Sequence, residues 1–238
     1  MADDSRSLTF PPPAVPLVAA RELGVMVRTA LWPLAKLHPL PKPDTTASPR
    51  PPVVMVHGYM GHPQFFRPIT RRLLEEGWRH TESIGYPSLL WSLERIISRI
   101  DETVDRLTAE HGGPVDVIGH SLGAVAMRAW LKLHGGAPKV RKFISLGGPH
   151  EGTDMYKLVV GPLRKVFDPD GVIVKQLNEG EEPVPTTVIR ARYDHQVFPP
   201  HRARIDGALE HIVDAYGHNG LLWSRKTHDI VVATLLRP

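Results

Sequence analysis

The sequence predicts an α/β fold in which a mostly parallel central sheet carries helices on both faces. The first observation is that short apolar segments alternate with helical segments from residue 53 to the end of the chain. The second is a run of four apolar residues, 53–56, that ends at a His-Gly pair, as expected of a strand buried on both faces. Strands separated by helices pair in parallel, and the helices then cover both faces of the sheet.

The individual elements follow from apolar periodicity and from glycine and proline positions. The clearest helix is expected at about residues 90–111, because its apolar residues recur at three- and four-residue steps and form one face. Gly112-Gly113-Pro114 is expected to end it. Further helices are expected at about 68–76, 121–133 and 224–236, and strands at 53–56, 81–86, 115–119, 142–146, 186–191 and 211–215.

Residues 1–52 form a proline-rich extension that precedes the main domain at 53–238. One helix is expected within residues 15–37, where apolar and charged positions are mixed. This helix either packs on the outside of the core or contacts a membrane surface or a partner. The proline-rich segment 39–52 is expected to be a non-helical linker.

The composition excludes several classes of protein. The chain has no cysteine, which excludes disulfides, thiolate metal sites and a cysteine nucleophile. The formal net charge is +4, but the basic residues are scattered, so no nucleic-acid partner is expected. No apolar run is long enough for a membrane span, and no signal peptide is recognised. We therefore expect a cytoplasmic protein, with peripheral membrane association as an open alternative.

The sequence Gly119-His120-Ser121-Leu122-Gly123 points most directly to chemistry. It lies between an expected strand and an expected helix, and a strand-to-helix turn this sharp lifts the serine hydroxyl above the sheet. The flanking glycines let neighbouring chain approach closely, and the helix N-terminus favours negative charge. The alternative is a serine in an ordinary glycine turn. The context favours Ser121 as a nucleophile.

A serine nucleophile needs a base, and His218 is predicted for this role. It stands in YGHNGLL, just past the last expected strand, where glycines on both sides allow a tight loop that projects the imidazole over the sheet. His211 falls inside that strand and His228 inside the final helix, so structural roles are expected for both. The alternative for His218 is an exposed loop histidine.

The acid that orients the base is expected to follow the strand at 186–191. Asp194 lies at that position, and its carboxylate would hold the imidazole in the required tautomer and offset its positive charge. Asp206 and Asp214 remain alternatives, because an error of one residue in a strand end changes which side chain faces inward.

Two backbone N–H groups are expected to stabilise a developing oxyanion. One belongs to Leu122, which follows the nucleophile, and the other to Tyr59, in the loop after the first strand. Their hydrogen bonds strengthen as the carbonyl oxygen becomes charged, which lowers the barrier.

A family resemblance is carried by Asp194 and by residues 53–61 (VVMVHGYMG), 117–123 (VIGHSLG), 145–153 (SLGGPHEGT) and 217–222 (GHNGLL). Together they look like the bacterial triacylglycerol lipase and esterase family of the α/β-hydrolase fold. The resemblance implies Ser121, Asp194 and His218 as a catalytic triad, with Tyr59 and Leu122 as oxyanion amides. It implies no cofactor and no metal in the reaction.

A small cap-like insertion is expected at residues 153–185, where apolar residues gather in two groups without a clear strand pattern. It either covers the site as a lid that holds an acyl chain or packs against the edge of the core. The function we expect is hydrolysis of carboxylic esters, with a small-molecule or lipid ester as substrate. Thioesterase, amidase and acyltransferase activities use the same groups, and a non-catalytic binding module on this fold is the alternative of a different class.

Overall fold

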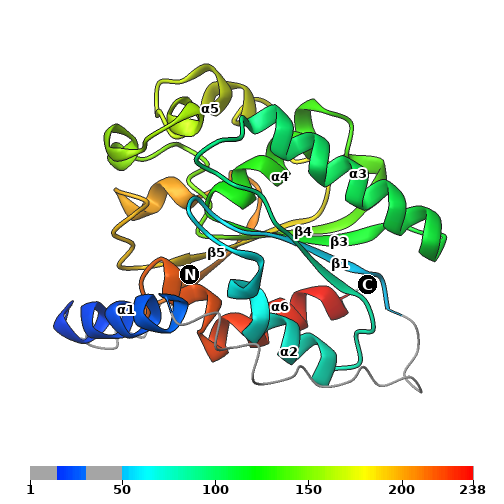
Figure 1. Ribbon diagram of the computed structural model, residues 1–238, viewed down its shortest axis with the longest axis horizontal. Coiled ribbons are helices and arrows are strands. Elements are labelled where there is room, and N and C mark those ends of the chain that lie inside the picture. Colours follow the sequence, from blue (N-terminus) through cyan, green and yellow to red (C-terminus); the bar gives the residue numbers. More distant parts are fainter. Residues whose placement is uncertain (1–14, 31–49, 238) are drawn as a thin grey trace, which may run out of the picture.

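The computed structural model describes residues 15–30 and 50–237, and its centre is a six-stranded sheet (Figure 1). The strands follow the order β2-β1-β3-β4-β5-β6, and every neighbouring pair is parallel. The strands are β1 (Val53–Val56), β2 (Thr81–Ile84), β3 (Val115–His120), β4 (Val140–Leu146), β5 (Thr186–Ala191) and β6 (Leu209–Val213). The fold class predicted from the sequence is confirmed.

Helices cover both faces of this sheet, which Figure 1 shows nearly edge-on. On one face lie α3 (Leu93–His111) and α4 (Leu122–Leu133), and on the other lie α2 (Arg67–Glu75) and α6 (Arg225–Leu236). The side chains of β1 alternate between the two helical layers. Val54 and Val56 belong to the core cluster with α3 and α4, whereas Val53 and Met55 belong to the cluster with α2 and α6.

Local signals set several boundaries. Helix α3 starts at Leu93 because the Ser92 hydroxyl accepts a hydrogen bond from the Arg95 N–H at 3.4 Å, and it ends at Gly112, whose φ is +70°. Strand β6 ends at Val213, two residues before the expected end at Ala215. This edge strand pairs only with β5, and that ladder ends where Ala191 meets Val213.

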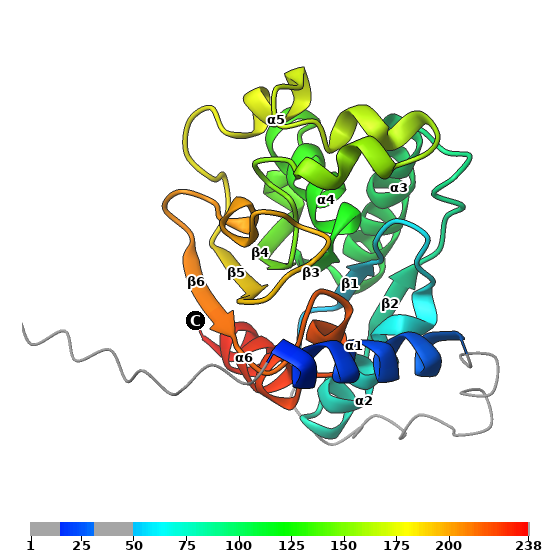
Figure 2. The same ribbon diagram turned by 90° about the vertical axis from the view of Figure 1, so that its left-hand side faces the viewer.

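The helix expected within residues 15–37 is α1 (Val15–Ala30), and residues 31–37 lie outside the described part of the chain. Figure 2 shows α1 lying beside the loop that precedes α6. Val18 and Val25 are buried, whereas Leu17 and Leu23 are exposed, so α1 packs through one face. Within residues 15–30 and 50–237, no helix is long and apolar enough to cross a membrane.

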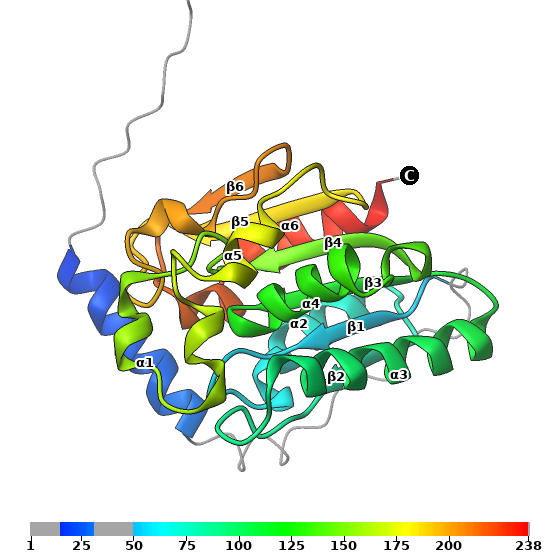
Figure 3. The same ribbon diagram turned by 90° about the horizontal axis from the view of Figure 1, so that it is seen from above.

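The insertion at 153–185 folds into the short helices η4 (Asp154–Leu158), η5 (Pro162–Val166) and α5 (Val172–Leu177). Figure 3 shows this region on the same side of the sheet as α3 and α4. Leu163 and Phe167 are buried in the core cluster on this face, whereas Leu158 and Val160 are exposed by 72% and 70%. The insertion therefore packs against the core and still presents apolar side chains to solvent.

Candidate active site

Ser121 stands between β3 and α4 in a strained backbone conformation. Its φ is +55° and its ψ is −121°, and the N–H of Ser121 donates to the carbonyl of Leu146 at 2.9 Å. Such a conformation costs about 1–3 kcal/mol in a residue other than glycine and is found mainly at functional sites. Ser121 is half-buried, whereas its neighbours His120 and Leu122 are buried, so the turn exposes this side chain.

The two glycines of the motif are required by close packing. A Cβ at Gly119 would lie 2.3 Å from the Cα of Ala124, in the helix that follows. A Cβ at Gly123 would lie 2.1 Å from the carbonyl oxygen of Val56, at the end of β1. Helix α4 therefore starts directly against the ends of β1 and β3, and this arrangement points its N-terminus at the carboxyl edge of the sheet.

His218 and Asp194 form a buried hydrogen-bonded pair at the same edge. The distance from His218 Nδ1 to Asp194 Oδ2 is 2.8 Å, and both side chains are almost inaccessible. The end of β4 contacts both His218 and Ser121. A Cβ at Gly147 would lie 3.4 Å from the His218 ring, and the carbonyl of Leu146, the residue before it, accepts the hydrogen bond from Ser121. Ser121 and His218 thus both lie next to the end of β4.

The Asp194 carboxylate has a partner for each oxygen. Oδ1 accepts hydrogen bonds from the N–H groups of Gln196 and Val197, each at 2.8 Å, and Oδ2 faces His218. Thr153, at the start of the insertion, braces the same loop, because its hydroxyl donates to the Gln196 carbonyl at 2.8 Å. The loop therefore holds the carboxylate in one orientation.

Each pKa is shifted in the direction that favours the charged form of its group, downward for Asp194 and upward for His218. Burial acts to raise the pKa of Asp194, but His218 and the two backbone donors outweigh it and hold this pKa below its usual range. Burial acts to lower the pKa of His218, but the Asp194 carboxylate outweighs it, helped by Glu22, so this pKa lies above 6.5. Asp194 would therefore stabilise an imidazolium if His218 accepted a proton.

His218 Nε2 is the atom that remains available for proton transfer. It is buried and has no hydrogen-bond partner among the described residues, so no hydrogen bond joins it to Ser121 in this structure. Such contacts are often long before substrate binds and tighten in the complex.

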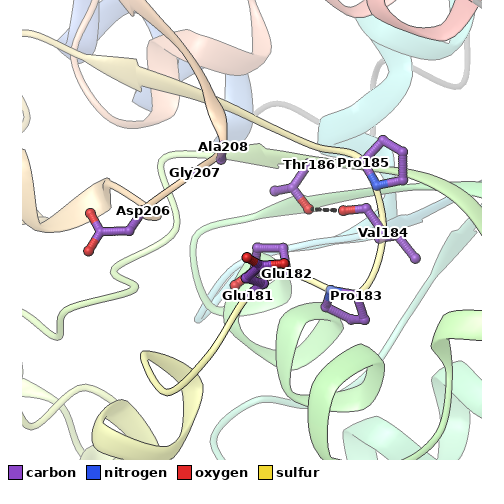
Figure 4. A pocket seen from close by; sticks show the side chains of 9 residues that line it. All are labelled: Glu181, Glu182, Pro183, Val184, Pro185, Thr186, Asp206, Gly207 and Ala208. Atoms are coloured by element: carbon purple, nitrogen blue, oxygen red, sulfur yellow. Dashed lines mark hydrogen bonds between the residues drawn. The ribbon is translucent and has the colours of Figure 1, made fainter.

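The rival acids lie elsewhere. Asp214 pairs with Arg192 at the surface. Asp206 is exposed and lines a cavity of about 450 Å³ together with Glu181 and Thr186 (Figure 4). This cavity lies where β5 and β6 begin, at the opposite edge of the sheet from Ser121. Neither rival carboxylate is placed to contact His218.

The expected oxyanion amides border the serine. Leu122 is the first residue of α4, and the first N–H groups of a helix have no acceptor within it. A Cβ at Gly58 would lie 2.8 Å from the Cβ of Ser121, so the loop that carries Tyr59 abuts the serine. The Tyr59 hydroxyl donates to the Val160 carbonyl at 2.6 Å, which joins this loop to the insertion.

Two histidines that the sequence did not single out also support the site. His120 Nε2 lies 3.3 Å from the carbonyl oxygen of His218, and His57 stacks on Tyr86 with ring centroids 4.2 Å apart. Burial, helped by the nearby His218, lowers the pKa of His120 to about 3, and burial lowers that of His57 to about 4. Both are therefore neutral hydrogen-bonding groups. In the sequence, only their positions next to Gly58 and Gly119 could have indicated that they lie at the site.

The fold and the site define a lipase- and esterase-like α/β-hydrolase. The mature form of lipase BlEst2 from Bacillus licheniformis is similar over 83% of this chain and 95% of its own, at 15% identity and a TM-score of 0.70. Aspergillus fumigatus lipase B is similar over 84% of this chain and 55% of its own, at 17% identity and a TM-score of 0.70. Residues 52–197 match the palmitoyl protein thioesterase family, and the chain belongs to that family.

Proposed function

We propose that this protein is a serine hydrolase that cleaves carboxylic esters through an acyl-enzyme on Ser121. The observation that carries the proposal is the buried His218–Asp194 hydrogen bond at the sheet edge where the strained, half-buried Ser121 stands. A histidine paired in this way presents one free ring nitrogen, and Asp194, which raises the pKa of His218, favours the imidazolium that forms when a base accepts a proton.

In the proposed reaction, Ser121 Oγ attacks the ester carbonyl carbon while His218 Nε2 takes the hydroxyl proton. The N–H groups of Leu122 and Tyr59 donate to the oxyanion of the tetrahedral intermediate. The C–O bond to the alcohol then breaks, and the imidazolium returns the proton to the departing alkoxide. Water next attacks the acyl-enzyme with His218 again as base, which releases the carboxylic acid and restores Ser121.

Thioester hydrolysis is the second candidate, and the family match favours it. The same attack on a thioester expels a thiolate, which is a better leaving group than an alkoxide and needs less help from His218. The two substrates therefore differ in their dependence on proton donation, while Ser121 and the oxyanion amides serve both.

A lipid or long-chain acyl substrate is proposed because exposed apolar side chains lie on segments that contact the loop carrying Tyr59. Met60, Leu90, Leu158 and Val160 are exposed by 68%, 78%, 72% and 70%. The hydrogen bond from Tyr59 to Val160 and the close packing of Gly161 against the Leu89 carbonyl tie these segments together. Peripheral contact with a membrane through this surface, or through the exposed face of α1, is part of the same proposal.

The proposal is tested with p-nitrophenyl esters and matched acyl thioesters of increasing chain length. Burial contributes about 0.8 kcal/mol per methylene, so kcat/KM should rise with acyl length until the site is full. Higher kcat/KM for esters than for thioesters of the same acyl group supports esterase activity, and the reverse supports a thioesterase. No turnover of either series would refute the proposal.

The double variant Leu158→Ser, Val160→Ser is expected to flatten this dependence on chain length and leave acetate hydrolysis unchanged. Both side chains are exposed beside the Tyr59 loop, where they could contact a long acyl chain. Because they are not packed in the core, their replacement should not disturb the hydrolysis of a short ester. Leu133→Ser, at the far end of α4, is the matched control because Leu133 is also exposed and apolar. A parallel loss on acetate and octanoate esters would show that the insertion only packs against the core.

A further inference from the structure

Glu22 is a buried carboxylate on α1, a helix that lies outside the segment matched by the thioesterase family. Its side chain is 5% exposed, although it belongs to α1, which precedes residues 52–197 in the chain. Val18 and Val25 are buried on the same helix, at spacings of four and three residues from Glu22, so all three share one face. The carboxylate is therefore held against the domain by apolar packing on either side.

The partners of Glu22 belong to the loop of the base. Glu22 Oε1 accepts a hydrogen bond from the Gly220 N–H at 2.7 Å, and Oε2 accepts one from the Asn219 N–H at 3.3 Å. These two residues open the short helix η7 (Asn219–Leu222), and His218 is the residue immediately before it. Glu22 thus binds the first two backbone amides after His218.

The loop is shaped to admit this side chain. A Cβ at Gly220 would lie 2.5 Å from Glu22 Oε1, and one at Gly217 would lie 2.7 Å from Glu22 Cγ. At both glycines that flank His218 and Asn219, Glu22 therefore occupies the space that a Cβ would need. A second contact strengthens the docking: Arg21 Nη1 donates to the Ala215 carbonyl at 2.9 Å.

We propose that Glu22 is a positioning residue for His218, and that docking of α1 holds the His218 loop in its working geometry. The inference rests on the proposed function, because it assigns a role in that reaction.

Few hydrogen bonds among the described residues orient His218. Among residues 15–30 and 50–237, its ring has one hydrogen bond, to Asp194, and its carbonyl lies near His120. Glu22 holds the chain just after His218, so its loss frees the backbone that carries the ring. A displacement of a reacting group by about 1 Å can lower the rate about 100-fold. The charged and titratable groups that face His218 are Asp194, Glu22 and His120.

The test is Glu22→Gln in the full chain, assayed with the best ester of the panel. An amide keeps the size but offers one acceptor oxygen to two N–H donors, so we expect kcat to fall about 10-fold with little change in KM. A second readout is the acid limb of kcat/KM against pH. Burial lowers the pKa of His218, and Asp194 and then Glu22 raise it, so removal of the Glu22 charge should move this limb to lower pH.

Asp116→Asn is the matched control, because it is the same change at another buried carboxylate. Asp116 is fully buried and pairs with Arg141 near the start of β3, at the opposite edge of the sheet. This variant is expected to lower the melting temperature and to leave both kcat and the acid limb unchanged. If Glu22→Gln does not fold, the partly exposed Arg21→Ala, which loses the contact with Ala215, is expected to lower kcat about threefold.

The outcomes separate this inference from the proposed function. Wild-type protein without turnover and without labelling by a fluorophosphonate would overturn the function, whatever Glu22 does. If the wild type is active and folded Glu22→Gln has an unchanged kcat and an unchanged acid limb, the positioning role alone is overturned. If Glu22→Gln does not fold, an unchanged kcat in Arg21→Ala overturns it instead. A fall in kcat and a shift of the acid limb in Glu22→Gln, absent in Asp116→Asn, would support it.

Discussion

Replacing Ser121 with alanine is expected to lower kcat for ester hydrolysis on the order of a millionfold. The reason is that the variant has no nucleophile, while the oxyanion amides and His218 remain. Alanine keeps the Cβ and the strained φ of +55°, so the melting temperature should stay close to that of the wild type. Steady-state kinetics together with thermal unfolding provide the measurement.

Ser145→Ala is the matched control for this experiment. Ser145 lies on β4, is fully buried, and its hydroxyl is 2.7 Å from His150 Nε2, so the chain contains a buried serine–histidine hydrogen bond that does not involve Ser121. Burial holds the pKa of His150 well below 6.5, and no solvent reaches either side chain. We expect a loss of stability without a loss of turnover. Turnover that survives in Ser121→Ala and disappears in Ser145→Ala would contradict the assignment of the nucleophile.

Asp194→Asn is expected to lower kcat about 10⁴-fold, the second largest effect. The carboxylate accepts three hydrogen bonds, from Gln196, Val197 and His218, and an amide has only one acceptor oxygen. If the amide oxygen keeps the two backbone donors, its NH₂ group faces Nδ1 of His218. The imidazole then carries its proton on Nε2, which is the wrong tautomer for a base.

Asp206→Asn and Asp214→Asn serve as controls for the acid. Asp206 is exposed beside the cavity at the far edge of the sheet, and Asp214 pairs with Arg192. Both variants should retain wild-type kcat. A loss of several orders of magnitude in either one, with activity kept in Asp194→Asn, would reassign the acid.

Local sequence patterns were sufficient to predict most of the fold. The run at 53–56 is buried on both faces, and the glycines at 119 and 123 lie where α4 meets the strand ends. Both features leave a local pattern in the sequence, an unbroken apolar run and two glycines around Ser121, which is why they were visible there. The end of β6 was misplaced because it is set by the ladder with β5 and not by the apolar residues of β6 itself.

Long-range contacts could not be predicted in the same way. Glu22 lies among mixed apolar and charged residues, and nothing near it in the sequence indicates that its partners are residues 219 and 220. The insertion presents the same difficulty. Its apolar residues have no regular period, so the burial of Leu163 and the exposure of Leu158 depend on how the segment packs on the core.

The most direct test of the account is to locate the covalent adduct formed with a fluorophosphonate. The protein is labelled at neutral pH, digested, and its peptides are analysed by mass spectrometry. We expect one modified site, Ser121, with labelling lost in Ser121→Ala and kept in Ser145→Ala. An adduct on any other residue, or no adduct on a protein that hydrolyses the esters, would contradict it.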